Sequence, residues 1–124
     1  MSQDVVADAL NKIMNGKRSK KESIVVTRFS KLLIEILNIA KNKGYIKDYK
    51  LDKKSLEVEI GELNECRAIK PRFNVTKDEI IKYMKRFLPA KDVGIIIIST
   101  SKGLMTHQDA IEKNIGGCLI AYFY

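Results

Sequence analysis

Hydrophobic positions recur at intervals of three and four in several parts of the chain, the spacing of an amphipathic helix. Gly16 and Gly44 follow two such stretches, where a glycine C-cap is expected to end a helix, and Gly116-Gly117 is expected to break the last one. Ser30 and Thr106 are favourable N-caps, and Thr76–Glu79 has the spacing of a capping box. The predicted helices cover residues 4–15, 31–40, 80–88 (ended by Pro89) and 107–113.

Short β-branched or alternating runs predict the strands. Leu56, Val58 and Ile60 alternate with glutamates, so one face of that strand is expected to be buried and the other solvated. Ile95–Ile98 is an unbroken run typical of a strand buried on both faces. Pro71 makes its extended segment an edge strand rather than a central one. The predicted strands cover residues 24–26, 46–51, 55–60, 68–75, 94–100 and 118–124, the last beside Ile95–Ile98.

This order of elements predicts an α+β protein built from two small modules. Residues 1–62 form an N-terminal α-β-α-β-β module. Residues 63–124 form a C-terminal module that is mostly β, with one or two short helices. The boundary is set where the hydrophobic pattern resets, around residues 61–67.

Composition narrows the class of protein. The chain has 124 residues, 45% of them hydrophobic, which is enough to build a core. No window approaches the roughly 18 apolar residues of a membrane span, and the N-terminus lacks the pattern of a secretory signal. Cys66 and Cys118 lie far apart without metal-ligand spacing. We therefore expect a soluble cytoplasmic protein with reduced thiols and no membrane contact.

The net charge points to a polyanionic partner. The 23 Lys and Arg residues against 15 Asp and Glu give +8. Residues 11–54 alone hold 13 of the basic residues and only 4 of the acidic ones. An electrostatic footprint for nucleic acid would concentrate charge in this way. A lysine-rich surface that serves only solubility remains an alternative.

Catalytic patterns are incomplete. Ser99–Lys102 has the S-x-x-K spacing of serine acyl transferases, but it follows a strand and runs into a glycine, so no helix aligns the two side chains. His107 and Asp109 are two residues apart and do not share a helix face. A lone histidine at that position is expected to be solvated or to make a local hydrogen bond. We predict no enzyme activity, no metal and no cofactor.

A hydroxyl-rich turn carries the strongest chemical signal. Ser99, Thr100, Ser101, Lys102 and Gly103 follow a predicted buried strand. Hydroxyls and backbone N–H groups bind phosphates and ribose 2′-OH groups, a lysine adds charge, and a glycine permits close approach. The sequence therefore predicts an RNA contact at this turn.

Two further basic sets accompany the turn. Lys70 and Arg72 would share one face of an edge strand, where they could follow an RNA backbone. Ser30 is better explained as a helix cap than as a ligand contact, although the N-terminus of its helix also suits a phosphate. The other basic set lies in loops and at helix ends of the N-terminal module. It consists of Lys17, Arg18, Lys20, Lys21, Arg28 and Lys31.

The chain resembles a known family at several points. The segment from Ser99 to Ala110, followed by Gly116-Gly117 and a closing aromatic strand, is similar to the small-subunit ribosomal protein eight family (the universal S-eight family). The opening helix and the start of the second helix agree in order and spacing. The segments 68–73 and 88–94 resemble the archaeal and eukaryotic branch.

The resemblance implies a non-catalytic component of the small ribosomal subunit in the cytoplasm. Such a protein would bind the central domain of small-subunit rRNA, support assembly of the platform, and contact neighbouring small-subunit ribosomal proteins. Away from the ribosome it would be a monomer. The family's RNA contacts would fall on Ser99–Gly103, with further contacts near Asn15, Ser30 and Lys31. Bacterial members carry a Glu where this chain has Cys118, so that contact does not carry over.

A second reading stays open at this point. The chain could be a protein-interaction module of a larger assembly, with only nonspecific affinity for nucleic acid. The predicted edge at residues 68–75 and the hydrophobic C-terminal strand would then form the contact. Salt dependence of RNA binding and preference for a cognate stem separate the two readings.

Overall fold

The structure is a computed structural model, and it describes residues 5–70, 72–90 and 93–124. The chain divides into two compact units, unit 1 up to Arg67 and unit 2 from Ala68 to Tyr124. This division lies after the predicted boundary at residue 62, because the buried Leu63 and Cys66 belong to unit 1. The Cys66 thiol donates to Leu10 O at 3.6 Å, and burial raises the pKa of this thiol to about 12.

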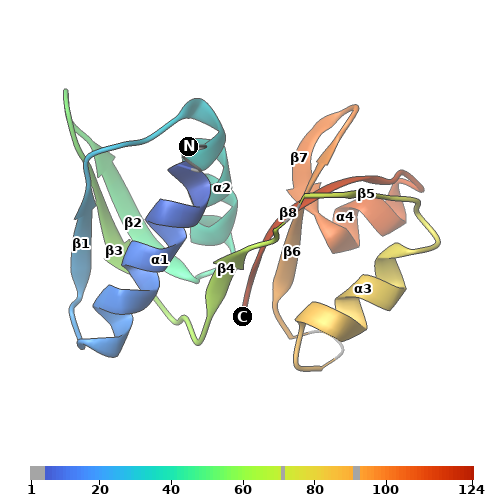
Figure 1. Cartoon of the computed structure of the whole chain (residues 1–124), viewed down its shortest axis with the longest axis horizontal. Coiled ribbons are helices and arrows are strands. Elements are labelled where there is room, and N and C mark those ends of the chain that lie inside the picture. The colour runs from blue at the N-terminus through green and yellow to red at the C-terminus, as the bar shows by residue number, and fades with distance from the viewer. Residues whose placement is uncertain (1–4, 71, 91–92) are drawn as a thin grey trace. The chain divides into compact units, whose positions relative to one another are not determined.

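Unit 1 has the α-β-α-β-β order that the sequence predicts. Its elements are α1 (Val5–Arg18), β1 (Ser23–Val26), α2 (Lys31–Asn42), β2 (Ile46–Leu51) and β3 (Leu56–Ile60). The antiparallel sheet has the order β1-β3-β2, and both helices cover one of its faces (Figure 1). Leu56 and Val58 are buried while Glu57 is exposed, so the predicted alternation is confirmed over these residues, whereas Glu59 and Ile60 are both partly exposed.

The two helices of unit 1 end at different types of residue. Gly44 ends α2 with φ +86°, as predicted. The prediction that α1 ends at Gly16 is wrong, because the helix continues to Arg18. Gly16 is needed inside α1 for packing, since a Cβ there would collide with the Ile24 side chain of β1.

Lys20 is the residue that ends α1. It has φ +59°, and its N–H donates to Lys17 O at 3.0 Å while the N–H of Lys21 donates to Gly16 O at 2.9 Å. These two hydrogen bonds form a Schellman motif with a lysine in the left-handed position that glycine usually takes.

Unit 2 is built on the second sheet. Its helices and strands are β4 (Cys66–Ala68), which spans the division, β5 (Asn74–Val75), α3 (Ile80–Phe87), β6 (Ile95–Thr100), β7 (Gly103–Thr106), α4 (His107–Glu112) and β8 (Gly117–Phe123). The strand order is β4-β8-β6-β7, and β5 also pairs with β8. Ile95–Ile98 are all buried, and β6 pairs with β8 as predicted. Strand β7 was not predicted.

The helices of unit 2 start with different caps. Thr106 Oγ1 accepts the N–H of Asp109 at 3.3 Å, which confirms it as the N-cap of α4. The capping box before α3 is only half formed. The carboxylate of Glu79 accepts the N–H and the hydroxyl of Thr76, but no side chain caps the first turn, which begins at Ile80. At its other end α3 stops at Phe87, before Pro89, as predicted.

Helix α4 ends at Glu112, one residue before its predicted end, but the residue that breaks it was predicted wrongly. Gly116-Gly117 was expected to break this helix, but Asn114 does so, with φ +56°. The N–H of Asn114 donates to Ile111 O at 3.1 Å, and that of Ile115 to Ala110 O at 3.0 Å, which is a second Schellman motif without glycine.

Candidate nucleic-acid interface

The hydroxyl-rich turn joins β6 to β7 as a two-residue hairpin. Thr100 pairs with Gly103, and Ser101 and Lys102 form the turn between them. The Thr100 hydroxyl donates to Gly103 O at 2.8 Å and accepts the N–H of Lys102 at 3.1 Å. Thr100 therefore holds the turn in shape from within.

The remaining groups of the turn point to solvent. Ser101, Lys102 and Gly103 are exposed and Ser99 is partly exposed. Within the described part of the chain, the hydroxyls of Ser99 and Ser101 form no hydrogen bond. Gly103 has φ +109° and no atom within 4 Å of the position a Cβ would take. The turn thus offers two hydroxyls, a lysine and an unobstructed backbone to a ligand.

Strand β8 approaches β6 closely next to the turn. A Cβ on Gly117 would collide with the carbonyl oxygen of Ser99. Because glycine stands at this position, the backbone of β8 can approach the Ser99 carbonyl closely, and Cys118 is the residue of β8 that pairs with Ser99.

His107 has a structural position. It is 1% exposed, and its Nδ1 accepts the N–H of Ile96 at 3.1 Å. Of the two roles expected for this histidine, solvation is wrong, and the side chain instead makes a hydrogen bond, to β6. Among the described residues, no three His, Cys, Asp or Glu side chains lie together as a metal site would require.

Lys70 and Arg72 lie on the segment between β4 and β5. Both side chains are exposed. Ile69, which follows β4 and precedes Lys70, is buried. The predicted strand over residues 68–75 is therefore wrong, because β4 and β5 are separate and both cations lie between them; Pro71 lies outside the described residues. Both cations lie in unit 2, the unit that carries the turn.

In unit 1, Asn15 is exposed on α1 between two small clefts. A cleft of about 250 Å³ has Lys12 and Arg28 in its wall, and one of about 180 Å³ has Arg18 and Arg67. Asn11, one turn before Asn15, lines both clefts as well. Sequence reasoning missed Asn11 and Lys12, although their spacing from Asn15 on one helix could have indicated them.

The other predicted contacts of unit 1 lie on different surfaces. Lys17 is partly buried and, two residues from Asn15, does not share its helix face. Ser30 Oγ accepts the N–H of Leu33 at 3.2 Å, so its role as the N-cap of α2 is confirmed. Lys31 is exposed in the first turn of α2, which contains no acidic residue.

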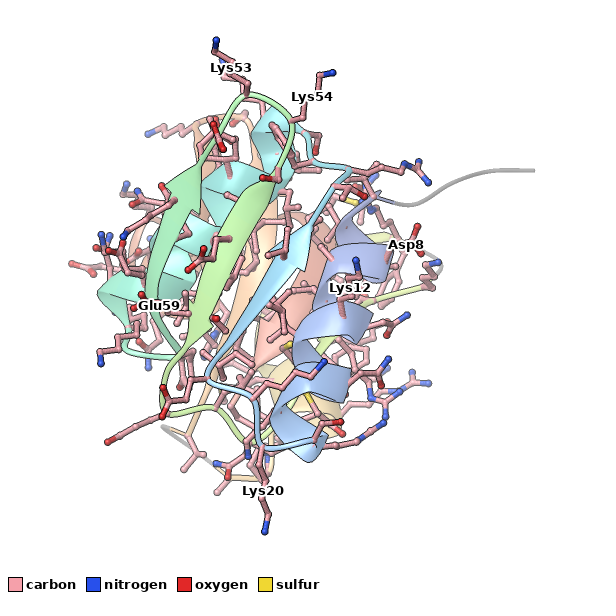
Figure 2. All side chains as sticks on the ribbon, turned by 90° about the vertical axis from the view of Figure 1, so that its left-hand side faces the viewer. Asp8, Lys12, Lys20, Lys53, Lys54 and Glu59 are labelled. Carbon is pink, nitrogen blue, oxygen red and sulfur yellow. The ribbon has the colours of Figure 1, made fainter. Side chains whose placement is uncertain are left out.

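Positive charge in unit 1 is spread over the surface. Lys20 lies at one end of the unit, and Lys53 and Lys54 lie at the opposite end (Figure 2). The basic excess of residues 11–54 therefore does not form a single patch. By unit, the charges are equal, because residues 1–67 and 68–124 each carry +4.

Comparison with known proteins places this arrangement in a family. The family model described as Ribosomal protein S8 matches residues 4–124. The chain belongs to the ribosomal protein S8 family. It is 46% identical to the small ribosomal subunit protein uS8 of Nanoarchaeum equitans over 100% of both chains. It is 35% identical to uS8A of Schizosaccharomyces pombe, over 98% of each chain.

Membership confirms the resemblance drawn from the sequence, including its archaeal and eukaryotic character. A member of the ribosomal protein S8 family is a structural component of the small ribosomal subunit in the cytoplasm, and it is not an enzyme. None of the described helices is long and apolar enough to cross a membrane.

Proposed function

We propose that this S8-family protein binds the central domain of small-subunit rRNA directly and thereby supports assembly of the platform. The β6–β7 hairpin end carries this proposal, since Ser99 and Ser101 present hydroxyls that no described residue engages. Away from the ribosome the protein is a monomer. Within the ribosome, its protein partners are neighbouring small-subunit ribosomal proteins.

The two units have different tasks in this proposal. In unit 2, Ser99 and Ser101 select the RNA by hydrogen bonds, and Thr100 fixes the turn. Lys102 and Gly103 hold the RNA backbone close to the turn. Lys70 and Arg72 add phosphate contacts. In unit 1, Asn15, Lys17, Ser30 and Lys31 anchor the RNA. Phosphate contacts supply affinity and position, whereas shaped hydrogen bonding at the turn supplies discrimination.

The test is a titration with the central-domain rRNA stem and a scrambled duplex of equal length at two salt concentrations. The native protein should prefer the stem, and this preference should survive added salt. A Ser99→Ala/Ser101→Ala variant should lose about 1 kcal/mol of discrimination for each lost hydrogen bond. Unchanged discrimination in this variant would contradict the assignment of the turn.

A second candidate function is favoured by one observation in unit 2. A groove of about 670 Å³ between α3 and α4 is lined mainly by apolar side chains, among them Ile81, Met84, Leu88 and Ile111. A groove of this size and character fits a neighbouring small-subunit ribosomal protein. If the titration shows equal binding of stem and scramble that collapses with salt, protein contact becomes the main function.

A further inference from the structure

Five aromatic rings form a continuous chain across unit 2. All are partly exposed, and we call them the aromatic strip. Their centroids are 4.9 Å apart for Phe73 and Tyr83, 6.4 Å for Tyr83 and Phe87, 5.6 Å for Phe87 and Tyr122, and 6.1 Å for Tyr122 and Tyr124. Five of the nine aromatic residues of the chain are therefore gathered on one surface.

Two cations lie directly on this strip. Lys82 Nζ is 5.9 Å from the centroid of Tyr83, and Arg86 Cζ is 5.9 Å from that of Phe87. Both cations are exposed on α3, which contains no acidic residue. Two of the five rings thus carry a cation, the rings pack against the core of unit 2 and stay partly exposed, and the helix contributes no carboxylate.

The strip lies away from the hydroxyl-rich turn. Tyr122 pairs with Ile96 at the start of β6, whereas the turn follows Thr100 at its end. Thr100 follows Ile96 by four residue steps along the strand, or roughly 13 Å. Figure 1 shows α3 and the end of β8 at the opposite end of unit 2 from the β6–β7 turn. A ligand on the strip would leave the turn available.

We propose that the aromatic strip binds a single-stranded RNA segment. Unpaired bases stack on the partly exposed rings, and Lys82 and Arg86 neutralise phosphates of the same strand. Paired bases cannot use the rings because their faces are occupied within a duplex. An acidic peptide would need only the cations and leave the rings without a matching flat partner. The inference rests on the proposed function, which places the protein on RNA, and adds a second RNA element to it.

The first measurement uses the native full-length protein and a fluorescein-labelled decauridylate, which has no duplex structure. Binding should raise the anisotropy of the probe. The chain has no Trp, and three of its five Tyr residues lie in the strip, so stacking should also quench the intrinsic tyrosine fluorescence. Absence of binding, or binding without quenching, would overturn the inference.

Two variants locate the site, each with a matched control. Tyr83→Leu removes one ring while keeping an apolar side chain, and it should weaken decauridylate binding about tenfold. Its control is Tyr49→Leu in unit 1, where Lys41 Nζ lies 5.8 Å from the ring centroid of an isolated tyrosine. Lys82→Gln/Arg86→Gln should weaken binding similarly, whereas Lys53→Gln/Lys54→Gln, with the same loss of charge, should not.

Equal effects of strip and control variants would show nonspecific attraction and overturn the inference. Thermal unfolding by circular dichroism checks each variant, and the exposed Lys82 and Arg86 keep the test decisive if Tyr83→Leu does not fold. Binding of decaglutamate that depends on Tyr83, without binding of decauridylate, would instead identify a protein contact. The Ser99→Ala/Ser101→Ala variant should retain decauridylate binding, so loss of stem preference and failure of the strip are distinguishable.

Discussion

At the scale of single residues, three helices of this protein end in the same way with three different side chains. Lys20, Gly44 and Asn114 all have positive φ and follow α1, α2 and α4. Only glycine adopts this conformation without a steric cost from Cβ, and asparagine is the next most tolerant residue. Lys20 is the least suited of the three, so its backbone is strained.

Replacing Lys20 with glycine should therefore stabilise unit 1. We expect Lys20→Gly to raise the free energy of unfolding by roughly 0.5–1 kcal/mol, because the relief of Cβ strain exceeds the added entropy of the unfolded chain. Urea denaturation followed by circular dichroism measures the change. Lys21→Gly is the control, since Lys21 does not have positive φ and gains nothing from glycine. A loss of stability in Lys20→Gly equal to that in Lys21→Gly would contradict the argument.

Glu79 makes stability depend on acidity. Hydrogen bonds from the N–H and hydroxyl of Thr76 lower the pKa of this carboxyl below its usual value. The ionised form is thus favoured in the folded state. Its stabilisation is complete above the unfolded pKa and is lost as the pH falls through the folded pKa.

Glu79→Gln should then be less stable than the native protein at pH 7, and the difference should shrink as the pH falls below about 4.5, the reference pKa. Denaturation curves at pH 7 and at pH 3 measure this difference. Asp78→Asn removes a neighbouring exposed carboxylate that makes no hydrogen bond with the described residues. A gap for Glu79→Gln that is constant with pH would contradict the assigned cause.

At the scale of elements, the β6–β7 hairpin separates the groups that shape the turn from those that face a ligand. Thr100→Val keeps the size of the side chain but removes both hydrogen bonds of its hydroxyl. We expect a loss of about 1 kcal/mol of stability, together with weaker discrimination of the rRNA stem, because the turn is no longer fixed. Thermal unfolding and stem titration measure the two effects.

Ser99→Ala and Ser101→Ala form the matched comparison for Thr100→Val. Their hydroxyls make no hydrogen bond within the described residues, so stability should be unchanged while discrimination falls. If the serine variants lost stability as Thr100→Val does, the division between shaping and contacting groups would be wrong.

Hydrophobic pattern predicted most elements of this fold, because a buried face imposes its period directly on the sequence. Ile95–Ile98 took its predicted place for this reason, whereas Ser30 and Thr106 took theirs because a side-chain oxygen at the N-cap accepts an N–H of the first turn. Helix ends were harder to predict, since a glycine can serve packing as well as capping. Gly16 serves a close helix–strand contact, and the position expected for a glycine is held by Lys20.

Tertiary contacts explain the other differences. Strand β7 has four residues and follows the turn without a pattern of its own, so only pairing with β6 defines it. His107 is buried because the N–H of Ile96 needs an acceptor at that position. At the candidate site, sequence named the turn correctly as a turn, but it could not show which hydroxyl is used internally. It also placed Lys17 beyond the first helix, because Gly16 was expected to end that helix, whereas α1 continues to Arg18.

At the scale of the whole molecule, the positive charge is not concentrated where the proposed RNA contacts lie. The two units carry equal net charge, and within unit 1 Lys20 lies at the opposite end from Lys53 and Lys54 (Figure 2). If unit 1 anchors RNA, one of these ends should matter more than the other. The proposed contacts at Asn15 and Lys17 lie on α1, whose C-terminal end leads to Lys20 and Lys21.

Salt dependence of RNA binding identifies the anchoring end. We expect Lys20→Gln/Lys21→Gln to weaken stem and scramble alike and to reduce the slope of log K against log[salt] by about 1 for each lost phosphate contact. Lys53→Gln/Lys54→Gln removes the same charge from the opposite end and should leave the slope unchanged. Equal slopes for the two variants would mean that net charge alone attracts the RNA, because an anchoring surface must distinguish charges by position. A loss confined to the cognate stem in Lys20→Gln/Lys21→Gln would move part of the discrimination from the hairpin turn of unit 2 to unit 1.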